Sequence, residues 1–325
     1  MKLTRKLFCS VVALALAAPM VQAQSDYPNK PIRIVVPYAA GGGTDALARI
    51  VAKSMTTHLG QTVLVDNKPG GGTAIGASEI ARAAPDGYNL LWGDNTTFSL
   101  NPFLYKKLSY SPMDDFAPIS LTLKGALTLV AAPNTGFKSV ADVLAYAKAN
   151  PAKLQYGSAG NGTPHHLAME ALKLRAGVQM LHVPYKGEGP GLNDLLGGVT
   201  QLMFVGNTIA KQHVEGGRLK ALATADGARN ASMPDLPTVG ETLPGFSSNY
   251  WHALVAPAKT PAAIIQKINE AYGKAIREPE VVAFMTKSAA GNTLNLTTPA
   301  ELRKHMEEQL KVSAELVKAI DLKMD

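Results

Sequence analysis

The 325-residue sequence contains a single cysteine, Cys9. One cysteine can form neither an intrachain disulfide nor a metal site built from several thiolates. Aromatic residues are also few, at 6%, and charged residues make up only 18%. Hydrophobic residues still reach 46%, so the composition is that of a globular protein and excludes intrinsic disorder. The length corresponds to roughly two domains.

A long apolar run is absent after the first two dozen residues. Met1–Ala23 has the parts of a secretory signal peptide: Lys2, Arg5 and Lys6, then the apolar run Leu7–Ala18, then a small-residue cleavage site. A run of about 12 apolar residues is too short for a membrane span, which needs roughly 20. Cleavage would remove three of the 32 basic residues and the cysteine, and would lower the net charge from +7 to +4. We therefore predict an exported, disulfide-free protein, located in the periplasm of a bacterium.

Beyond residue 23, β-rich runs alternate with amphipathic helical runs, a pattern typical of an α/β fold with mainly parallel sheets. One strand–helix–strand–helix–strand set covers Pro31–Trp92, and a second set begins after residue 131. Ile119–Leu123 and Leu127–Ala131 are expected to cross between the two sets, and Tyr250–Ala256 is expected to return. Two similar units joined by two crossings predict a hinge and a ligand cleft at the carboxyl ends of the strands.

Capping residues mark several helix boundaries. Ser139 and Asp142 have the spacing of a capping box at the start of a helix that reaches Ala149. Prolines at the first helical position predict two C-terminal helices, Pro261–Arg277 and Pro299–Ile320.

A glycine-rich turn follows the first strand. Gly41, Gly43 and Ala46 match a variant of the dinucleotide-binding fingerprint, and Asp66 follows 20 residues later. Export, the long loop and the turn directly after Asp66 argue against a nucleotide, so we expect no cofactor. The same loop can bind a carboxylate, because glycines let backbone N–H groups approach an anion at a helix N-terminus. Thr44 is placed to reach such a ligand.

A second glycine-rich loop, Gly157–Thr163, also precedes a helix. Ser158 there raises an alternative, a secreted α/β hydrolase that uses His165 or His166 as its base. The nucleophile-elbow motif requires a glycine where this chain has Tyr156, and no metal-binding motif includes the two histidines. We therefore expect either a second anion-binding loop or a plain tight turn, and no catalysis. Basic residues are scattered, so nucleic-acid binding is not supported.

Several segments carry a combined pattern that is more specific than either glycine loop. They are Tyr27–Asp45, Asp66–Gly70, Ala84–Tyr88, Gly157–Gly162, Val183–Gly187, Met233–Thr238 and Pro244–Phe246. Together they resemble the Bug family, the extracytoplasmic solute receptors of tripartite tricarboxylate transporters. The resemblance implies a two-lobe periplasmic binding protein of type II-like fold, in which each lobe is a mainly parallel sheet flanked by helices. It also implies a monomer that closes on a small di- or tricarboxylate and delivers it to membrane permease subunits.

The resemblance further implies domain boundaries and site residues. Residues 24–125 would form the first part of lobe 1, residues 126–249 lobe 2, and residues 250–325 the return to lobe 1 with the C-terminal helices. The residues expected to bind the ligand are Tyr38, Ala40, Gly43, Thr44, Asn95, Thr96, Thr97, Ser158, Gly160, Asn161, Thr163, His166, Tyr185, Lys186 and Asn207.

Three positions differ from what is common in the family. Glu188 replaces a small residue, and Val205 stands where an aspartate is frequent, which favours a plain carboxylate over an acidic amino acid. Tyr38 replaces a phenylalanine and leaves room for an aromatic ligand such as a phthalate. A receptor that signals through a sensor kinase, instead of delivering solute, stays open as an alternative.

Overall fold

The structure, a computed structural model, describes residues 27–230, 233–288 and 293–324. Residues 1–23, for which we predict a signal peptide, lie outside the described residues. The strands are β1 (Ile32–Val36), β2 (Val63–Asn67), β3 (Asn89–Asp94), β4 (Phe116–Ala131), β5 (Gln155–Ser158), β6 (Leu181–Pro184), β7 (Leu202–Gly206), β8 (Lys220–Thr224), β9 (Asn249–Pro257) and β10 (Thr293–Leu294). The α-helices are α2 (Gly43–Leu59), α3 (Ala74–Ala81), α4 (Asn101–Leu104), α5 (Val140–Ala149), α6 (Pro164–Ala176), α7 (Glu188–Leu196), α8 (Asn207–Glu215), α9 (Val239–Thr242), α10 (Ala262–Ala275), α11 (Pro279–Ser288) and α12 (Pro299–Ile320).

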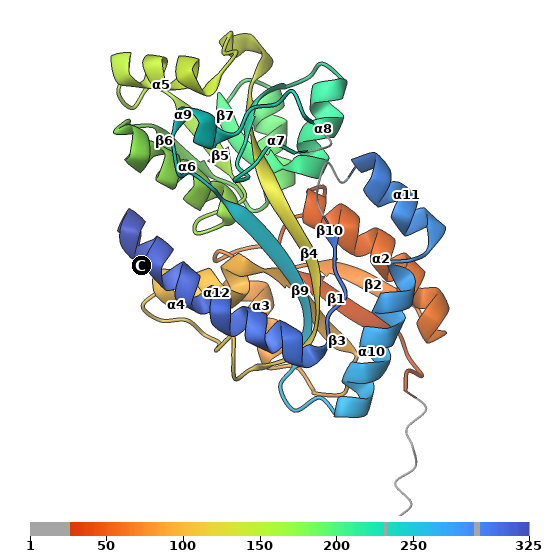
Figure 1. Cartoon of the computed structure of the whole chain (residues 1–325). Coiled ribbons are helices and arrows are strands. Elements are labelled where there is room, and N and C mark those ends of the chain that lie inside the picture. The colour runs from red at the N-terminus through yellow and green to blue at the C-terminus, as the bar shows by residue number, and fades with distance from the viewer. Residues whose placement is uncertain (1–26, 231–232, 289–292, 325) are drawn as a thin grey trace, which may run out of the picture.

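The elements form two lobes joined by two long strands (Figure 1). In lobe 1, β1 lies between β2 and β3 and is parallel to both. In lobe 2, β5 lies between β6 and β7 and is again parallel to both. The antiparallel strands β9 and β4 connect the two parallel sets, in the order β2-β1-β3-β9-β4-β7-β5-β6. The predicted α/β class and two-lobe architecture are confirmed.

The sequence predicted two short crossing strands where the structure has one. β4 runs for 16 residues without a break, and Lys124 and Gly125 stay paired with Trp251 and Tyr250 of β9. Its first part pairs with β9, and its second part pairs with β7 and β8 of lobe 2. The polar, flexible Lys-Gly pair suggested a turn, but cross-strand hydrogen bonds to β9 keep the backbone extended through it. One strand therefore serves both sheets.

Helices cover both faces of the parallel strands, which explains why these strands are almost continuously apolar. In lobe 1, α2 and α10 pack on one face, and α3 and α12 pack on the other. In lobe 2, α5 and α6 cover one face, and α7 and α8 cover the other. Each lobe thus has a core of its own on either side of its parallel strands.

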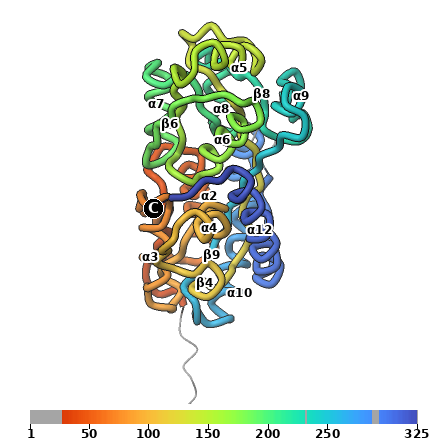
Figure 2. Tube along the Cα trace, turned by 90° about the vertical axis from the view of Figure 1, so that its left-hand side faces the viewer, coloured from red at the N-terminus to blue at the C-terminus, as the bar shows by residue number. Residues whose placement is uncertain are grey.

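The last helix also contacts lobe 2. Val317 of α12 packs with Leu167 of α6 and with Leu100 and Leu104 of lobe 1. Figure 2 shows the C-terminal end of the chain at the level where the two lobes meet. No helix of the described part of the chain is long and apolar enough to cross a membrane.

The predicted helix boundaries hold closely. Ser139 and Asp142 form the expected capping box, and α12 has the predicted bounds behind a second box made by Thr298 and Glu301. The helix predicted to reach Arg277 ends at Ala275, and α11 follows it without having been predicted.

Candidate functional site

The lobes face each other across an enclosed pocket with a volume of about 30 Å³. Lobe 1 contributes the loop after β1 and the first turn of α2, including Tyr38, Gly43 and Thr44. Lobe 2 contributes the first residues of α6 and α7, His165 and Glu188. Helices thus begin at the pocket from opposite sides, α2 in lobe 1 and α6 and α7 in lobe 2. The first N–H groups of a helix have no partner within it. Such positions favour a negatively charged group.

The loop after β1 is shaped by glycine and by Asp45. Gly41 has a φ of +91°, a backbone conformation that other residues rarely adopt, and its N–H donates to Asp45 Oδ2 over 3.1 Å. Asp45 also pairs with Arg49 at 2.9 Å and accepts from Asn67. Burial opposes ionisation of Asp45, but the bonds from Arg49, Gly41 and Asn67 outweigh burial and lower its pKa. Asp45 therefore holds the loop, and Arg49 balances its charge.

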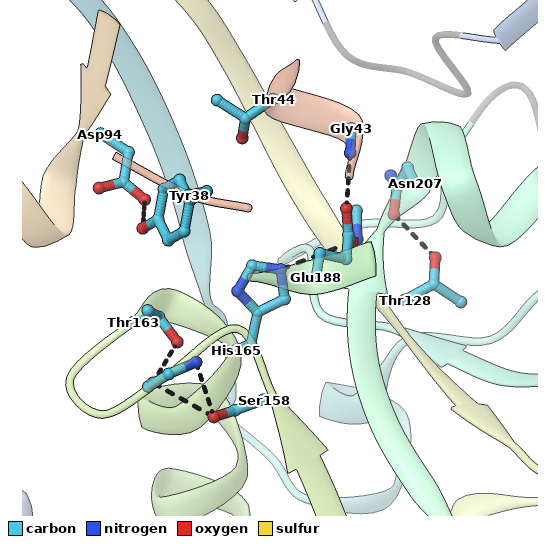
Figure 3. A network of polar contacts seen from close by, with 12 residues as sticks. Tyr38, Gly43, Thr44, Asp94, Thr128, Ser158, Thr163, His165, Glu188 and Asn207 are labelled. Carbon is cyan, nitrogen blue, oxygen red and sulfur yellow. Dashed lines mark hydrogen bonds and ion pairs between the residues drawn. The ribbon is translucent and has the colours of Figure 1, made fainter. Parts of the chain in front are cut away.

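The end of β3 carries a buried carboxylate on the same side of the pocket. Asp94 is 3% exposed and accepts hydrogen bonds from the Tyr38 hydroxyl at 2.6 Å and from the Thr96 N–H at 3.0 Å. Burial raises the pKa of Asp94, and these hydrogen bonds oppose that rise. Figure 3 shows the Tyr38–Asp94 pair opposite Glu188, with His165 between them in this view.

The side chain of Glu188, a residue of lobe 2, reaches lobe 1. Its Oε2 accepts from the N–H of Gly43 at 2.9 Å, and its Oε1 accepts from the N–H of Gly206 at 2.5 Å (Figure 3). Burial opposes ionisation of Glu188, but interactions with His165 and the two amides outweigh burial and lower its pKa. Its carboxylate thus stays charged while it is 7% exposed.

Two histidines complete the pocket. His165 Nε2 lies 3.5 Å from Glu188 Oε1. His252 of β9 is 3% exposed, and burial lowers its pKa to about 3, so its ring is neutral. Its Nδ1 accepts from Trp92 at 3.4 Å, and its Nε2 lies 3.5 Å from the Thr44 hydroxyl. A neutral ring with an acceptor at Nδ1 carries its proton at Nε2, on the side of Thr44.

Ser158 lies behind the pocket wall. Its hydroxyl is fully buried, lies 2.6 Å from His182 Nε2 and accepts from the Gly160 N–H at 3.1 Å. The rings of His182 and His166 stack with centroids 3.8 Å apart. Burial lowers the pKa of His182 to about 3 and that of His166 to about 4. This serine and its neighbouring histidine position the second glycine loop.

A second hollow of about 240 Å³ lies on the other side of Tyr38. It is bordered by the glycine turn Gly70–Gly72 and Tyr105 of lobe 1, and by Asn161 and Lys186 of lobe 2. The lobes touch beside it, where the Ala39 N–H donates to the Lys186 carbonyl over 2.8 Å.

The residues that the sequence predicts as ligand-binding do not all line the same pocket. Tyr38, Gly43 and Thr44 line the enclosed pocket. Those that border the second hollow are Tyr38, Gly160, Asn161, Tyr185 and Lys186. The fully or almost fully buried ones, which support the loops, are Thr96, Thr97, Ser158, Thr163, His166 and Asn207. Ala40 is exposed, and Asn95 is half-buried with a side-chain oxygen that has no partner among the described residues.

The side chains that border the pocket and that sequence reasoning did not select include four titratable ones that the pocket geometry singles out: Asp94, His165, Glu188 and His252. Glu188 was noted only as a departure from the family pattern. His165 borders the pocket where His166 was expected, because the two neighbours point about 100° apart on α6. Val205 packs in the lobe 2 core with Leu192 and Leu195, so an acid at the pocket comes from position 188 instead.

Among the described residues, no group of three or more histidine, cysteine, aspartate or glutamate side chains could hold a metal ion. Asp66, the candidate ribose-binding acid, pairs with Arg33 at 3.0 Å and lies 3.5 Å from Lys68. Its carboxylate is thus engaged with basic side chains of lobe 1.

Comparison with known proteins agrees with this geometry. The family model for the tripartite tricarboxylate transporter family receptor matches residues 47–322. The structure of the periplasmic binding protein BugD is 36% identical, has a TM-score of 0.88, and covers 92% of this chain and 100% of that one.

Two similar structures were solved with ligands. MatC from Rhodopseudomonas palustris with bound malate is 30% identical with a TM-score of 0.85, and covers 90% of this chain and 100% of that one. An R. palustris protein with adipate is 29% identical with a TM-score of 0.86, and covers 91% of this chain and 99% of that one.

Proposed function

The chain belongs to the tripartite tricarboxylate transporter receptor family, together with the Bug proteins, and we propose that it captures a small organic carboxylate between its lobes and delivers it to a membrane transporter. The observation that carries this proposal is the pocket at the junction of the lobes, where α2 and α6 both begin. Helix N-termini stabilise an anion without a fixed positive side chain. Malate and adipate, bound by two similar proteins, are small organic carboxylates.

Closure of the lobes accompanies binding in this proposal. β4 and β9 connect the lobes, and the contacts between the lobes include the hydrogen bonds of Ala39 with Lys186 and of Gly43 with Glu188, and the packing of Val317 on Leu167. Such contacts can open and re-form while each lobe keeps its core. A ligand that touches both lobes binds the closed form better and shifts the population toward it. We further propose lobe boundaries at residues 24–125 with 250–325, and 126–249.

We also propose that the chain reaches the periplasm through a signal peptide at residues 1–23, acts as a monomer, and docks in its closed form on the permease subunits. N-terminal sequencing of the protein from a periplasmic extract tests the first of these points, and the expected first residue is Gln24. A signalling role through a sensor kinase uses the same closure and is the alternative if deletion of the permease leaves the response to the ligand intact.

The hydrolase alternative has one observation in its favour, the contact of Ser158 with His182. The serine is fully buried, and burial lowers the pKa of His182 to about 3, which makes it a weak base. Both facts favour a structural role. An esterase assay of the wild-type protein beside Ser158→Ala distinguishes the two functions.

The proposed function is tested by a thermal-shift screen with a panel of carboxylates, after bound ligand has been removed by unfolding and refolding. A ligand at 100 times its Kd adds roughly 2.7 kcal/mol of stability, which gives a measurable shift in Tm. We expect at least one small carboxylate to stabilise the protein. A panel without any stabilising carboxylate would contradict the proposal.

A further inference from the structure

Glu188 occupies the position in which an anionic ligand would be expected. Its two carboxylate oxygens accept from Gly43, the first residue of α2, and from Gly206, directly before α8. These are backbone donors at helix N-termini, the kind of donor that binds a ligand carboxylate. The anion therefore comes from the protein itself, and it comes from the lobe opposite α2.

The surroundings of Glu188 are shaped to hold it. A Cβ atom at Gly42 would lie 3.2 Å from the Glu188 Cβ, and one at Gly43 would lie 3.3 Å from its Oε2. Gly187 has a φ of +148° and lies close to the backbone of Ala39. A Cβ atom at position 187 would lie 2.9 Å from the backbone nitrogen of Ala39. Gly42 and Gly43 thus leave room for the Glu188 side chain, and Gly187 lets the two lobes approach each other beside it.

A neighbouring buried polar atom lacks a partner. The Nδ1 of His165 is buried and has no hydrogen-bond partner among the described residues. The other ring nitrogen, Nε2, lies 3.5 Å from Glu188 Oε1. His165 Nδ1 is therefore a second polar atom, beside Glu188, with which a ligand group can pair.

The charges around the pocket favour a ligand group that is positively charged. Asp45, Asp94 and Glu188 line it, and none of the described lining residues is a lysine or an arginine. Arg49, which does not line the pocket, balances Asp45, and Lys186 borders the second hollow instead. A second ligand carboxylate would lie among like charges in a water-poor space, where repulsion is strong.

We propose that Glu188 takes the place of one ligand carboxylate, so that the cleft selects a ligand with a single carboxylate whose other end is an ammonium group facing Glu188. The inference rests on the proposed function, since it names the class of carboxylate that the receptor takes. Glu188 is then the residue that determines specificity, and the ligand carboxylate is left with the remaining amides at the first turns of α2 and α6.

The test uses diacids and amino acids of equal chain length: succinate with β-alanine, glutarate with 4-aminobutanoate, and adipate with 5-aminopentanoate. Each is titrated calorimetrically into the ligand-stripped protein. We expect the wild-type protein to bind the amino acid at least 10-fold more tightly than the diacid in each pair that binds. Glu188→Gln should reduce that ratio at least 10-fold. Glu215→Gln, at an exposed glutamate of α8, is the matched control and should leave the ratio unchanged.

Two outcomes would overturn the inference alone: a wild-type protein that binds the diacid as tightly as its amino acid partner, or a ratio that Glu188→Gln leaves unchanged. The wild-type comparison needs no variant, so it decides even if Glu188→Gln does not fold. Absence of binding by every member of all three pairs would overturn the inference, and absence of binding across the wider carboxylate panel would overturn the proposed function as well.

Discussion

The Tyr38 hydroxyl donates a 2.6 Å hydrogen bond to the carboxylate of Asp94, and both side chains are buried where the loop after β1 meets the end of β3. Asp94 also accepts from Thr96, so one carboxylate joins two adjacent strand ends. Burial raises the pKa of Asp94, and each hydrogen bond to its charged form opposes that rise. The pair fixes the lobe 1 side of the pocket before any ligand arrives.

Tyr38→Phe is expected to lower the free energy of unfolding by about 1–3 kcal/mol, because it removes a donor from a buried carboxylate. Urea unfolding measures this difference. Tyr146→Phe, at an exposed tyrosine of α5, is the control and should change stability by less than about 0.5 kcal/mol. Equal stability of the two variants would show that the Tyr38–Asp94 bond contributes nothing measurable.

Ser158→Ala is expected to weaken ligand binding even though the serine is fully buried. Its hydroxyl bonds to Gly160 and lies against His182, so its loss loosens the second glycine loop beside the cleft. Calorimetry should show a several-fold rise in Kd with the fold retained. Unchanged affinity would show that this loop does not contribute to ligand binding.

Thr44→Val keeps the shape of the side chain and removes the hydroxyl that lies 3.5 Å from His252 Nε2 at the pocket. Loss of one polar contact of about 1 kcal/mol corresponds to roughly a 5-fold rise in Kd. If both Thr44→Val and Ser158→Ala bind like the wild-type protein, the carboxylate lies elsewhere in the cleft.

The buried His252 predicts a specific loss of stability in acid. Its pKa is about 3 in the folded protein and 6.5 when unperturbed, so the unfolded chain binds a proton between these values that the folded chain does not. The contribution of His252 is therefore complete above about pH 6.5 and is lost as the pH falls toward 3. The slope of the unfolding free energy against pH is proportional to the number of protons that the chain takes up when it unfolds. Between about pH 6 and pH 4, His252→Gln should take up about one proton fewer than the wild-type protein, so its slope should be smaller by that amount. Equal slopes in the two proteins would contradict a neutral His252.

Much of the fold follows from local sequence signals. Helix α12 was predicted to the residue from the proline at its first position, and the structure adds a capping box of Thr298 and Glu301. The continuity of β4 could not be predicted, since Lys124 and Gly125 read as a turn until their pairing with β9 is known.

The sequence predicted which loops form the site, but not which side chains of the two lobes face the pocket. Glycine-rich turns at strand ends indicated where an anion could bind, and the Tyr38 loop does border the pocket. Which atoms face the pocket depends on how two distant lobes meet, and no local pattern encodes this. The contact between Gly43 and Glu188 joins residues 145 positions apart, and His252 lies in a strand whose sequence carries no sign of function.

A distance measured across the cleft shows whether a small carboxylate closes the two lobes. Spin labels at Thr57→Cys on α2 and Asn193→Cys on α7, both exposed positions, in a protein with Cys9→Ser, report the separation of the lobes by pulsed electron paramagnetic resonance. We predict a broad distance distribution without ligand and a narrow, shorter one at a saturating concentration of a carboxylate that binds in calorimetry. A distribution that saturating ligand leaves unchanged would contradict the account.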